Sequence, residues 1–287
     1  MTDAALSSGD PPVATRRLII GTNTKLHHTP SETVDYLREL GEKGPRVLDN
    51  DRVQLFLCPP YTSLPAAVPA ARRTGLPVWI GAQNVDGHLD GAFTGEISTP
   101  MLVDLGTDLV LLGHAERRNL FGETNESLAK KVVVALAGGL RVMLCVGEKA
   151  DDREHGVGVE TVRRQVKIAL SGISVDQLDQ VMIAYEPVWA IGASTAAGPA
   201  DIRPIIAEIT SALDDRFGTS RPDVPVIYGG SVSVAAVGQL LRELPNLDGF
   251  LLGRVGLTVD GLLGVVQSSL EARPVLEPVH QVGSGRR

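Results

Sequence analysis

The sequence predicts an α/β fold in which a single (β/α)8 barrel occupies nearly the whole chain. Eight short apolar runs recur along the 287 residues, and successive runs start 24 to 45 residues apart. Each interval has room for a helix and two loops, and apolar runs without alternation are typical of parallel strands buried on both faces. Because no Pro/Gly/Ser-rich linker or change of composition divides the chain, one barrel is favoured over two doubly wound domains.

The predicted strands are all short, which is usual for strands in a barrel. They are Leu18–Ile20, Val53–Cys58, Val78–Ile80, Leu109–Leu112, Val142–Val146, Val181–Tyr185, Val226–Tyr228 and Phe250–Leu252. A helix is expected to follow each strand and to return the chain to the start of the next one.

The helix after the first strand has the clearest start. Thr29 is a candidate N-cap, Pro30 stands at the first helical position and Glu32 at the third, which is the pattern of a capping box. Apolar residues then fall on one face of this helix: Val34, Leu37 and Leu40. Residues 1–16 and 273–287 lack such periodicity and are expected to be tails, so the barrel domain is expected to span residues 17–272.

Composition and charge narrow the classes of partner. Hydrophobic residues make up 43% and charged residues 21% of the chain, which is ordinary for a globular protein. The formal net charge is −7, so the sequence lacks the basic footprint of a protein that binds nucleic acid. No binding to nucleic acid is expected.

The cysteines and the N-terminus indicate a cytoplasmic protein. The two cysteines, Cys58 and Cys145, each lie inside an apolar run, which is typical of buried, reduced thiols. The N-terminal segment contains acidic residues and no apolar core of a signal peptide, and charges or glycines interrupt every later stretch long enough to span a bilayer. We therefore expect neither secretion nor membrane insertion.

Polar residues follow the predicted strands at the points where the strands end. In a barrel these residues would line one rim, and that rim carries the active site. They are Asn23 and Lys25, Gln83 and Asn84, His114 and Glu116, Glu148, Glu186, Ser231 and Arg254. A lysine, a histidine and several carboxylates therefore converge on one end of the barrel.

At these rim segments the sequence resembles the triosephosphate isomerase family, from about residue 18 to residue 265. Nine segments in family order carry the resemblance: GTNTK (21–25), GAQN (81–84), GAFTGEIS (91–98), LLGHAERR (111–118), FGETNE (121–126), CVGEKADDRE (145–154), AYEPVWAIG (184–192), YGGSV (228–232) and DGFLLGR (248–254). One such match would be weak, but nine in order are specific. The resemblance implies a TIM barrel and a sugar-phosphate isomerase.

The resemblance also implies roles for individual residues. Glu186 matches the base that removes a proton from the carbon beside the substrate carbonyl, and His114 matches the neutral electrophile. Asn23 and Lys25 match the residues that contact the substrate oxygens, and Glu116 matches the carboxylate beneath that lysine. Backbone N–H groups would hold the phosphate at Gly192, Ser231 and Gly253, beside the side chain of Arg254.

The chemistry of a carbonyl shift explains these residue types. It needs a base poised near neutral pH and hydrogen-bond donors aimed at the oxygen where negative charge develops. No cofactor is required. His27 and His28 lack further ligands at matching spacing, so no metal site is predicted. Glu123, Glu148 and Arg117 are interpreted as scaffold ion pairs behind the rim.

The chain departs from the family pattern at four places near the site. Ala115 stands where serine is usual, which removes a hydroxyl that would help to hold Glu186, and Thr24 replaces a tryptophan. Residues 193–198 lack the Gly-Lys-Thr run of the family lid. Arg254 takes the second position of the usual Gly-Gly phosphate site, where it either donates to the phosphate or pairs with a carboxylate in the outer layer.

These departures bear on the substrate. The lysine-free lid followed by Pro-Ala-Asp, together with Gly-Arg in place of Gly-Gly, resembles a branch of the family that isomerises erythrulose phosphates. The chemical residues are intact while the phosphate end is altered, so we favour a four-carbon substrate. The alternative is the glycolytic interconversion of dihydroxyacetone phosphate and glyceraldehyde 3-phosphate.

Two other function classes stay open. A lyase could use Lys25 as a Schiff-base nucleophile, although a nearby Glu116 would oppose the low pKa that such a lysine needs. A non-catalytic binding barrel is suggested by the altered lid and by Ala115. The family typically forms dimers and, in some thermophiles, tetramers. The GAFTGEIS segment with Thr94 matches the loop that enters the neighbouring subunit, so at least a dimer is expected, with a homodimer as the favoured form.

Overall fold

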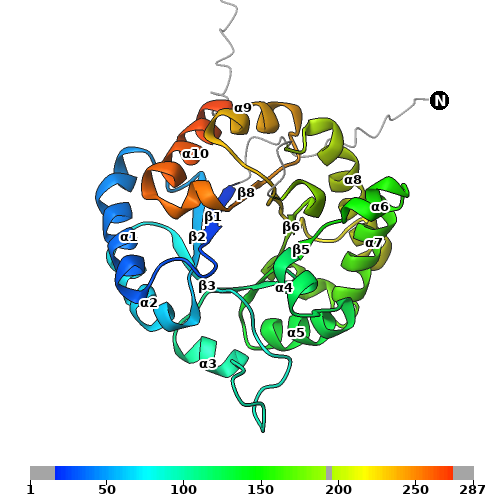
Figure 1. Cartoon of the computed structure of the whole chain (residues 1–287), viewed down its shortest axis with the longest axis horizontal. Coiled ribbons are helices and arrows are strands. Elements are labelled where there is room, and N and C mark those ends of the chain that lie inside the picture. Colours follow the sequence, from blue (N-terminus) through cyan, green and yellow to red (C-terminus); the bar gives the residue numbers. More distant parts are fainter. Residues whose placement is uncertain (1–16, 192–195, 274–287) are drawn as a thin grey trace, which may run out of the picture.

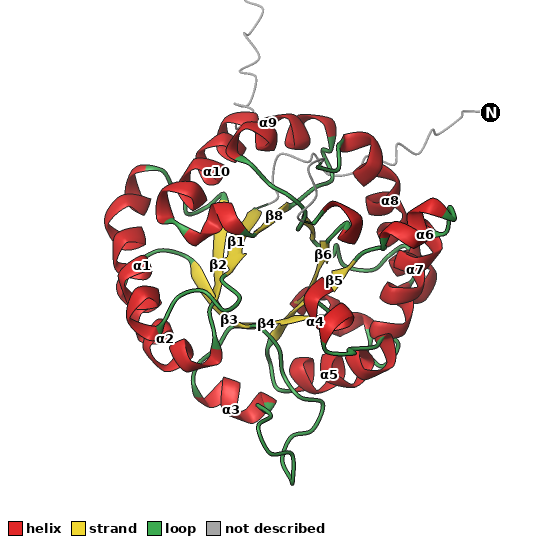
Figure 2. Ribbon diagram, in the orientation of Figure 1, coloured by secondary structure: helices red, strands yellow, loops and turns green. Residues whose placement is uncertain are grey.

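Eight parallel strands close into one barrel, and helices surround it (Figures 1 and 2). The computed structural model describes residues 17–191 and 196–273. The strands are β1 (Leu18–Asn23), β2 (Val53–Cys58), β3 (Val78–Ala82), β4 (Leu109–Leu112), β5 (Arg141–Val146), β6 (Val181–Tyr185), β7 (Val226–Tyr228) and β8 (Gly249–Leu252). The predicted (β/α)8 barrel and its eight strands are thus confirmed.

Strand β1 is longer than its apolar run. Its pairing with β2 continues through Gly21 and Thr22 to Asn23, beyond the predicted end at Ile20. Gly21 permits this because a Cβ there would lie 2.0 Å from the carbonyl oxygen of Phe56. Backbone pairing in a closed ring therefore extends the strand past the point where hydrophobicity stops, and it carries Asn23 to the rim.

One or two α-helices follow each strand. They are α1 (Pro30–Lys43), α2 (Leu64–Arg73), α3 (Thr99–Asp104), α4 (Ala115–Leu120), α5 (Asn125–Ala137), α6 (Ala150–Glu154), α7 (Gly158–Ala169), α8 (Pro199–Phe217), α9 (Val234–Glu243) and α10 (Val259–Ala272). The predicted start of α1 is confirmed, since Thr29 and Glu32 form both bonds of a capping box and Pro30 is the first helical residue.

The molecule has two apolar layers. The larger one lies between the strands and the helices, and the smaller one fills the inside of the barrel with side chains such as Phe56, Met143 and Met182. Cys58 and Cys145 belong to the inner layer, and both are free and buried, as predicted. A filled interior leaves the open space for a ligand at the ends of the barrel.

One loop departs from the compact ring. Residues 83–98, between β3 and α3, project away from the barrel at the lower edge of Figure 1. At the other end of the domain, Arg273 still bonds to the barrel, because its guanidinium donates to the carbonyl oxygens of Pro245 and Leu247. The remaining residues of the two expected tails lie outside the described part of the chain. So do residues 192–195 of the lid, which include Gly192, a predicted phosphate-binding residue. None of the described helices is long and apolar enough to cross a bilayer.

Candidate active site

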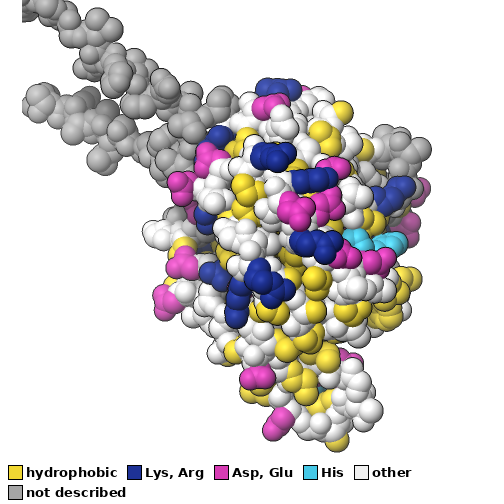
Figure 3. Space-filling model, turned by 90° about the vertical axis from the view of Figure 1, so that its left-hand side faces the viewer, with side chains coloured by type: hydrophobic (Ala, Val, Ile, Leu, Met, Phe, Trp, Pro, Cys, Tyr) yellow, Lys and Arg dark blue, Asp and Glu magenta, His cyan; other side chains and the backbone are white. Residues whose placement is uncertain are grey.

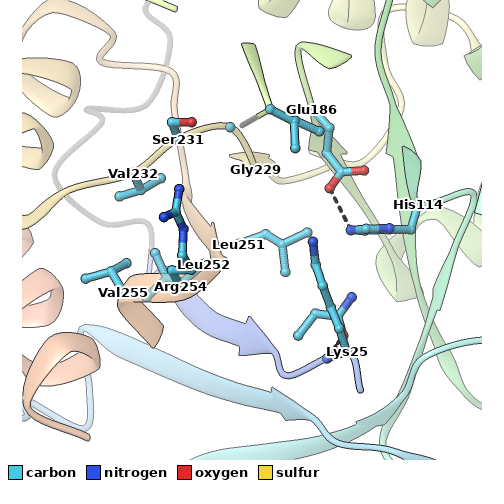
Figure 4. A pocket seen from close by; sticks show the side chains of 14 residues that line it. Lys25, His114, Glu186, Gly229, Ser231, Val232, Leu251, Leu252, Arg254 and Val255 are labelled. Atoms are coloured by element: carbon cyan, nitrogen blue, oxygen red, sulfur yellow. Dashed lines mark hydrogen bonds and ion pairs between the residues drawn. The ribbon is translucent and has the colours of Figure 1, made fainter. Parts of the chain in front are cut away.

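A cavity of about 320 Å³ opens at the carboxyl ends of the strands (Figure 4). Loops after β1, β4, β6, β7 and β8 supply its walls, so residues distant in sequence meet there. The lining residues are Asn23, Lys25, His114, Glu186, Ile191, Gly229, Gly230, Ser231, Val232 and Leu251 to Val255. Seven of the predicted site residues are therefore brought together, namely Asn23, Lys25, His114, Glu186, Ser231, Gly253 and Arg254.

Glu186 follows β6 and is a buried carboxylate, only 3% exposed. Two oxygen contacts fix it: Oε2 accepts the backbone N–H of Ala115 at 3.1 Å, and Oε1 lies 3.3 Å from Nε2 of His114. Two glycines make room for this residue. A Cβ on Gly147 would lie 1.8 Å from the Glu186 carbonyl oxygen, and one on Gly229 would lie 2.9 Å from its Cγ.

The contact with Ala115 shows how the Glu186 carboxylate is held without the serine hydroxyl of the family pattern. Alanine lacks the serine hydroxyl of the family pattern, but the backbone N–H at the first residue of α4 holds the carboxylate instead. This N–H has no partner within the helix, as is general for first-turn amides. The Ala115 side chain is therefore not required to fix the resting position of Glu186.

The orientation of His114 defines which ring nitrogen carries the proton. His114 is the N-cap of α4, and its Nδ1 accepts the backbone N–H of Glu116 at 3.3 Å. Because Nδ1 is an acceptor, the neutral imidazole has its proton on Nε2, which faces Glu186 and the cavity. The ring can therefore donate a hydrogen bond into the cavity.

Asn23 and Lys25 occupy the opposite wall. The Asn23 side-chain oxygen accepts the backbone N–H of Lys25 at 2.9 Å, and Lys25 has a φ of 53°, in the left-handed region. Gln83 supports this turn by donating to the Lys25 carbonyl oxygen at 2.9 Å. The Lys25 ammonium lies 2.7 Å from Oε1 of Glu116, as the resemblance implied.

The loops after β7 and β8 form the third wall. The backbone N–H groups of Ser231 and Gly253 have no acceptor within the described part of the chain, and the Ser231 hydroxyl donates to the carbonyl oxygen of Ala190 at 3.1 Å. Arg254 lines the same wall and has no carboxylate partner among the described residues. The alternative of an ion pair in the outer layer is therefore wrong for this structure.

Within residues 17–191 and 196–273, no three His, Cys, Asp or Glu side chains are arranged to hold a metal ion. Thr24 is fully buried, and its hydroxyl has no hydrogen-bond partner in the described structure.

Cys145 lies beneath the site, where burial and then the Glu186 carboxylate raise the pKa of its thiol well above the ordinary value. The thiol is therefore protonated beside the carboxylate.

Comparison with known proteins identifies the family. The sequence model of triosephosphate isomerase matches residues 18–269. The chain belongs to the triosephosphate isomerase family. It is 42% identical over 246 residues to the triosephosphate isomerase of Acetivibrio thermocellus, which covers 85% of this chain and 95% of that protein.

Two further relatives have the same name. The triosephosphate isomerase of Moorella thermoacetica is 38% identical over 251 residues, 88% of this chain and 98% of the relative. That of Carboxydothermus hydrogenoformans is 38% identical over 256 residues, 89% of this chain and 100% of the relative. The resemblance seen in the rim segments is thereby confirmed, and so is the enzyme class, an isomerase of sugar phosphates.

The scaffold behind this family site differs partly from expectation. Glu123 forms the predicted ion pairs, 2.5 Å from the Lys131 ammonium and 3.6 Å from Nε of Arg117. The prediction of an ion pair is wrong for Glu148. Its Oε1 accepts two neutral donors, the Tyr185 hydroxyl at 2.9 Å and the Trp189 indole N–H at 2.6 Å.

Arg153 is a residue that sequence reasoning missed. Its guanidinium stacks over the Trp189 ring, 4.0 Å from the centroid, and lies 2.8 Å from Oδ1 of Asp201 in the first turn of α8. Burial pushes the pKa of Asp201 up, but the bonds from Arg153 and from the Gly198 N–H lower it overall. Arg153 thus contacts both ends of the segment between β6 and α8, and the spacing of DDRE gives no signal of this.

We predict that Arg153→Ala alters the surroundings of Trp189. Loss of the stack should shift the tryptophan emission, measured in a Trp79→Phe background so that Trp189 is the sole fluorophore of its kind. The free energy of unfolding should fall by only about 0.5–1 kcal/mol, since the stack is partly exposed. Arg216→Ala is the matched control, because Arg216 stacks on Phe217 away from the site. An emission spectrum identical to that of the parent would contradict the prediction.

Proposed function

We propose that this protein isomerises a short phosphorylated sugar by moving its carbonyl group to the neighbouring carbon through an enediolate. The observation that carries the proposal is the pairing of Glu186 with the Nε2 side of His114 in one cavity. A buried base beside a neutral hydrogen-bond donor is what proton transfer next to a carbonyl requires.

The proton balance is simple. Glu186 takes a proton from the carbon beside the carbonyl, and the bonding electrons move to form the enediolate, whose negative oxygen faces donors from His114 and Lys25. His114 gives its Nε2 proton to this oxygen and takes one from the neighbouring hydroxyl. Glu186 then returns a proton to the other carbon, so the product is an isomer and nothing else is consumed.

The other walls support the same reaction. The Lys25 ammonium and the Asn23 amide are placed to stabilise negative charge on the substrate oxygens. The free N–H groups of Ser231 and Gly253 are suited to phosphate oxygens. The Lys25–Glu116 contact weighs against a Schiff-base lyase, because a close carboxylate stabilises the charged ammonium.

For the substrate we propose a four-carbon erythrulose phosphate. The chemical residues match the family, whereas the phosphate rim carries Arg254 and the segment before α8 lacks the lysine of the family lid. The second candidate is the three-carbon substrate pair of glycolysis, which the names of the relatives support. We also propose a cytoplasmic location, which the two free, buried thiols support.

Replacing the base tests the reaction type. Glu186→Gln keeps the shape and removes the proton acceptor, so turnover should fall by about 10²-fold or more. Incorporation of solvent deuterium at the substrate carbon should fall in parallel. Inhibition by inorganic phosphate should remain, since the N–H groups are untouched. Undiminished deuterium incorporation by the variant would remove Glu186 from the base role.

A side-by-side assay tests the substrate. We expect kcat/KM for erythrulose phosphate to exceed that for glyceraldehyde 3-phosphate by roughly tenfold or more, the effect of about 1.4 kcal/mol of differential binding in the transition state. The wild-type triosephosphate isomerase of Acetivibrio thermocellus is the reference for the opposite preference. A higher value with the triose would assign the glycolytic reaction instead.

We further propose that the protein acts as a homodimer. A second hollow of about 440 Å³ shares Asn23, Lys25 and His114 with the active-site cavity, and exposed apolar side chains wall it: Leu26, Leu120 and Phe121. The projecting loop 83–98 exposes Leu89 and Phe93. Figure 3 shows hydrophobic side chains gathered on this projection and on the body above it. The loop and the hollow are suited to each other in two copies of the chain.

Thr94, within this loop, is expected to lie in the subunit interface. Phe93→Asp, beside it, should produce monomers in sedimentation velocity and lower kcat/KM by about tenfold or more. In the proposed dimer, the loop of one copy supports the wall that holds Asn23 and Lys25 in the other copy, and the monomer loses that support. Val175→Asp changes an exposed apolar residue away from the loop and should remain dimeric. A monomer with full activity at the assay concentration would contradict the prediction.

A further inference from the structure

Arg254 adds a charged side chain to a cavity wall that otherwise offers only backbone N–H groups to an anion. It opens the short helical turn η6 (Arg254–Leu257) directly after β8, and its side chain is exposed. Figure 4 shows the guanidinium extending along the cavity wall, past Val232, toward Ser231. The charged end therefore lies on the side of the cavity opposite His114 and Glu186.

The two cations that line the cavity are in different situations. The Lys25 ammonium is 2.7 Å from a Glu116 carboxylate oxygen, so an ion pair already offsets much of its charge. Arg254 has neither an ion pair nor a side-chain hydrogen bond within the described chain. Arg254 is thus the cation of this cavity whose charge remains available to a ligand.

Charge balance makes such a cation important here. Glu186 places a buried carboxylate in the cavity, Glu116 stands behind Lys25, and the whole chain has a formal net charge of −7. Without Arg254 the ionised side chains around the cavity would repel a phosphate dianion. With it, the wall near Ser231 attracts the phosphate while the wall near Glu186 does not.

From this arrangement we infer that Arg254 binds the phosphate group of the substrate through its side chain and sets the direction in which the sugar lies. The phosphate sits between the guanidinium and the free N–H groups of Ser231 and Gly253, so the reacting carbons extend toward His114 and Glu186. The inference rests on the proposed function and adds a residue that acts on the phosphate rather than on the carbonyl.

The guanidinium suits this role for two reasons. It presents several N–H donors in a planar fork that matches two phosphate oxygens at once, and it keeps its charge across the whole physiological pH range. Lysine at this position would keep the charge but lose the fork. Comparison of the alanine and lysine variants therefore separates the charge from the hydrogen-bond geometry.

The first experiment measures binding of inorganic phosphate by calorimetry and needs no turnover. Arg254→Ala should weaken the affinity by about 10- to 100-fold, and Arg254→Lys should recover part of the loss. Arg38→Ala is the matched control, because Arg38 is an exposed arginine on the outer face of α1. Phosphate affinity of Arg254→Ala equal to that of the wild type would overturn the inference.

The second experiment uses Arg254→Gly, which restores two consecutive glycines at this rim. KM should rise about tenfold or more and kcat should change little, and millimolar guanidinium chloride, far below denaturing concentrations, should restore part of kcat/KM. Near-ultraviolet circular dichroism confirms that the variant is folded. An unchanged KM, or a loss that guanidinium does not relieve in the folded variant, would overturn the inference.

The two experiments also separate this inference from the proposed function. If the wild type isomerises neither the triose nor the tetrulose phosphate, the proposed function fails, whereas loss of phosphate binding in Arg254→Ala still supports the contact. If the wild type isomerises one of them and Arg254→Ala binds phosphate normally, the proposed function stands and the role of Arg254 fails.

Discussion

In the proposed reaction the Glu186 carboxylate takes a proton from carbon, so it has to be shielded from water and yet remain ionised, and the construction of the site meets this requirement. Glu186 is almost fully buried, and its carboxylate contacts a backbone N–H at the start of α4, one imidazole edge and the protonated thiol of Cys145. A neutral donor stabilises the negative charge without cancelling it, as a lysine or arginine at the same place would. The cations of the cavity are accordingly placed elsewhere, on the loops after β1 and β8.

The closed ring of strands makes that separation possible. Because β1 pairs with both β2 and β8, Asn23 and Arg254 become neighbours on one side of the rim although 230 residues separate Thr22 from its partner Leu252. The loops after β4 and β6 face them across the opening. An open sheet would leave its two edge strands far apart, so closure itself brings the wall with Arg254 and the wall with Glu186 to the two sides of one small cavity.

Much of this was predictable because a barrel strand is buried on both faces and leaves an unbroken apolar run in the sequence. The eight runs located the strands, and the residues after them located Asn23, Lys25, His114 and Glu186. The ends of the strands were less predictable. Asn23 belongs to β1 because of pairing with Cys58, and pairing between distant strands has no local signal in the sequence.

The errors at Glu148 and Arg153 have one cause, which is that their partners are distant in the sequence. Glu148 has the composition of an ion-pair partner, and its real donors, Tyr185 and Trp189, belong to a strand and a turn that only the closed fold places beside it. Arg153 and Asp201 are 48 residues apart. The role of the Ala115 backbone was hidden for another reason, since every non-proline residue has the same N–H and a sequence comparison registers only the lost hydroxyl.

Two of the cavity walls also differ in how freely they can change. The wall with Glu186 and His114 is buried, and any side chain in place of Gly147 or Gly229 would displace Glu186. The wall with Gly253 and Arg254 is exposed, and a Cβ on Gly253 meets nothing within 4 Å. The proton chemistry proposed for this chain can therefore stay fixed while a change on the open wall, where the chain carries Arg254, alters the size and charge of the substrate that fits.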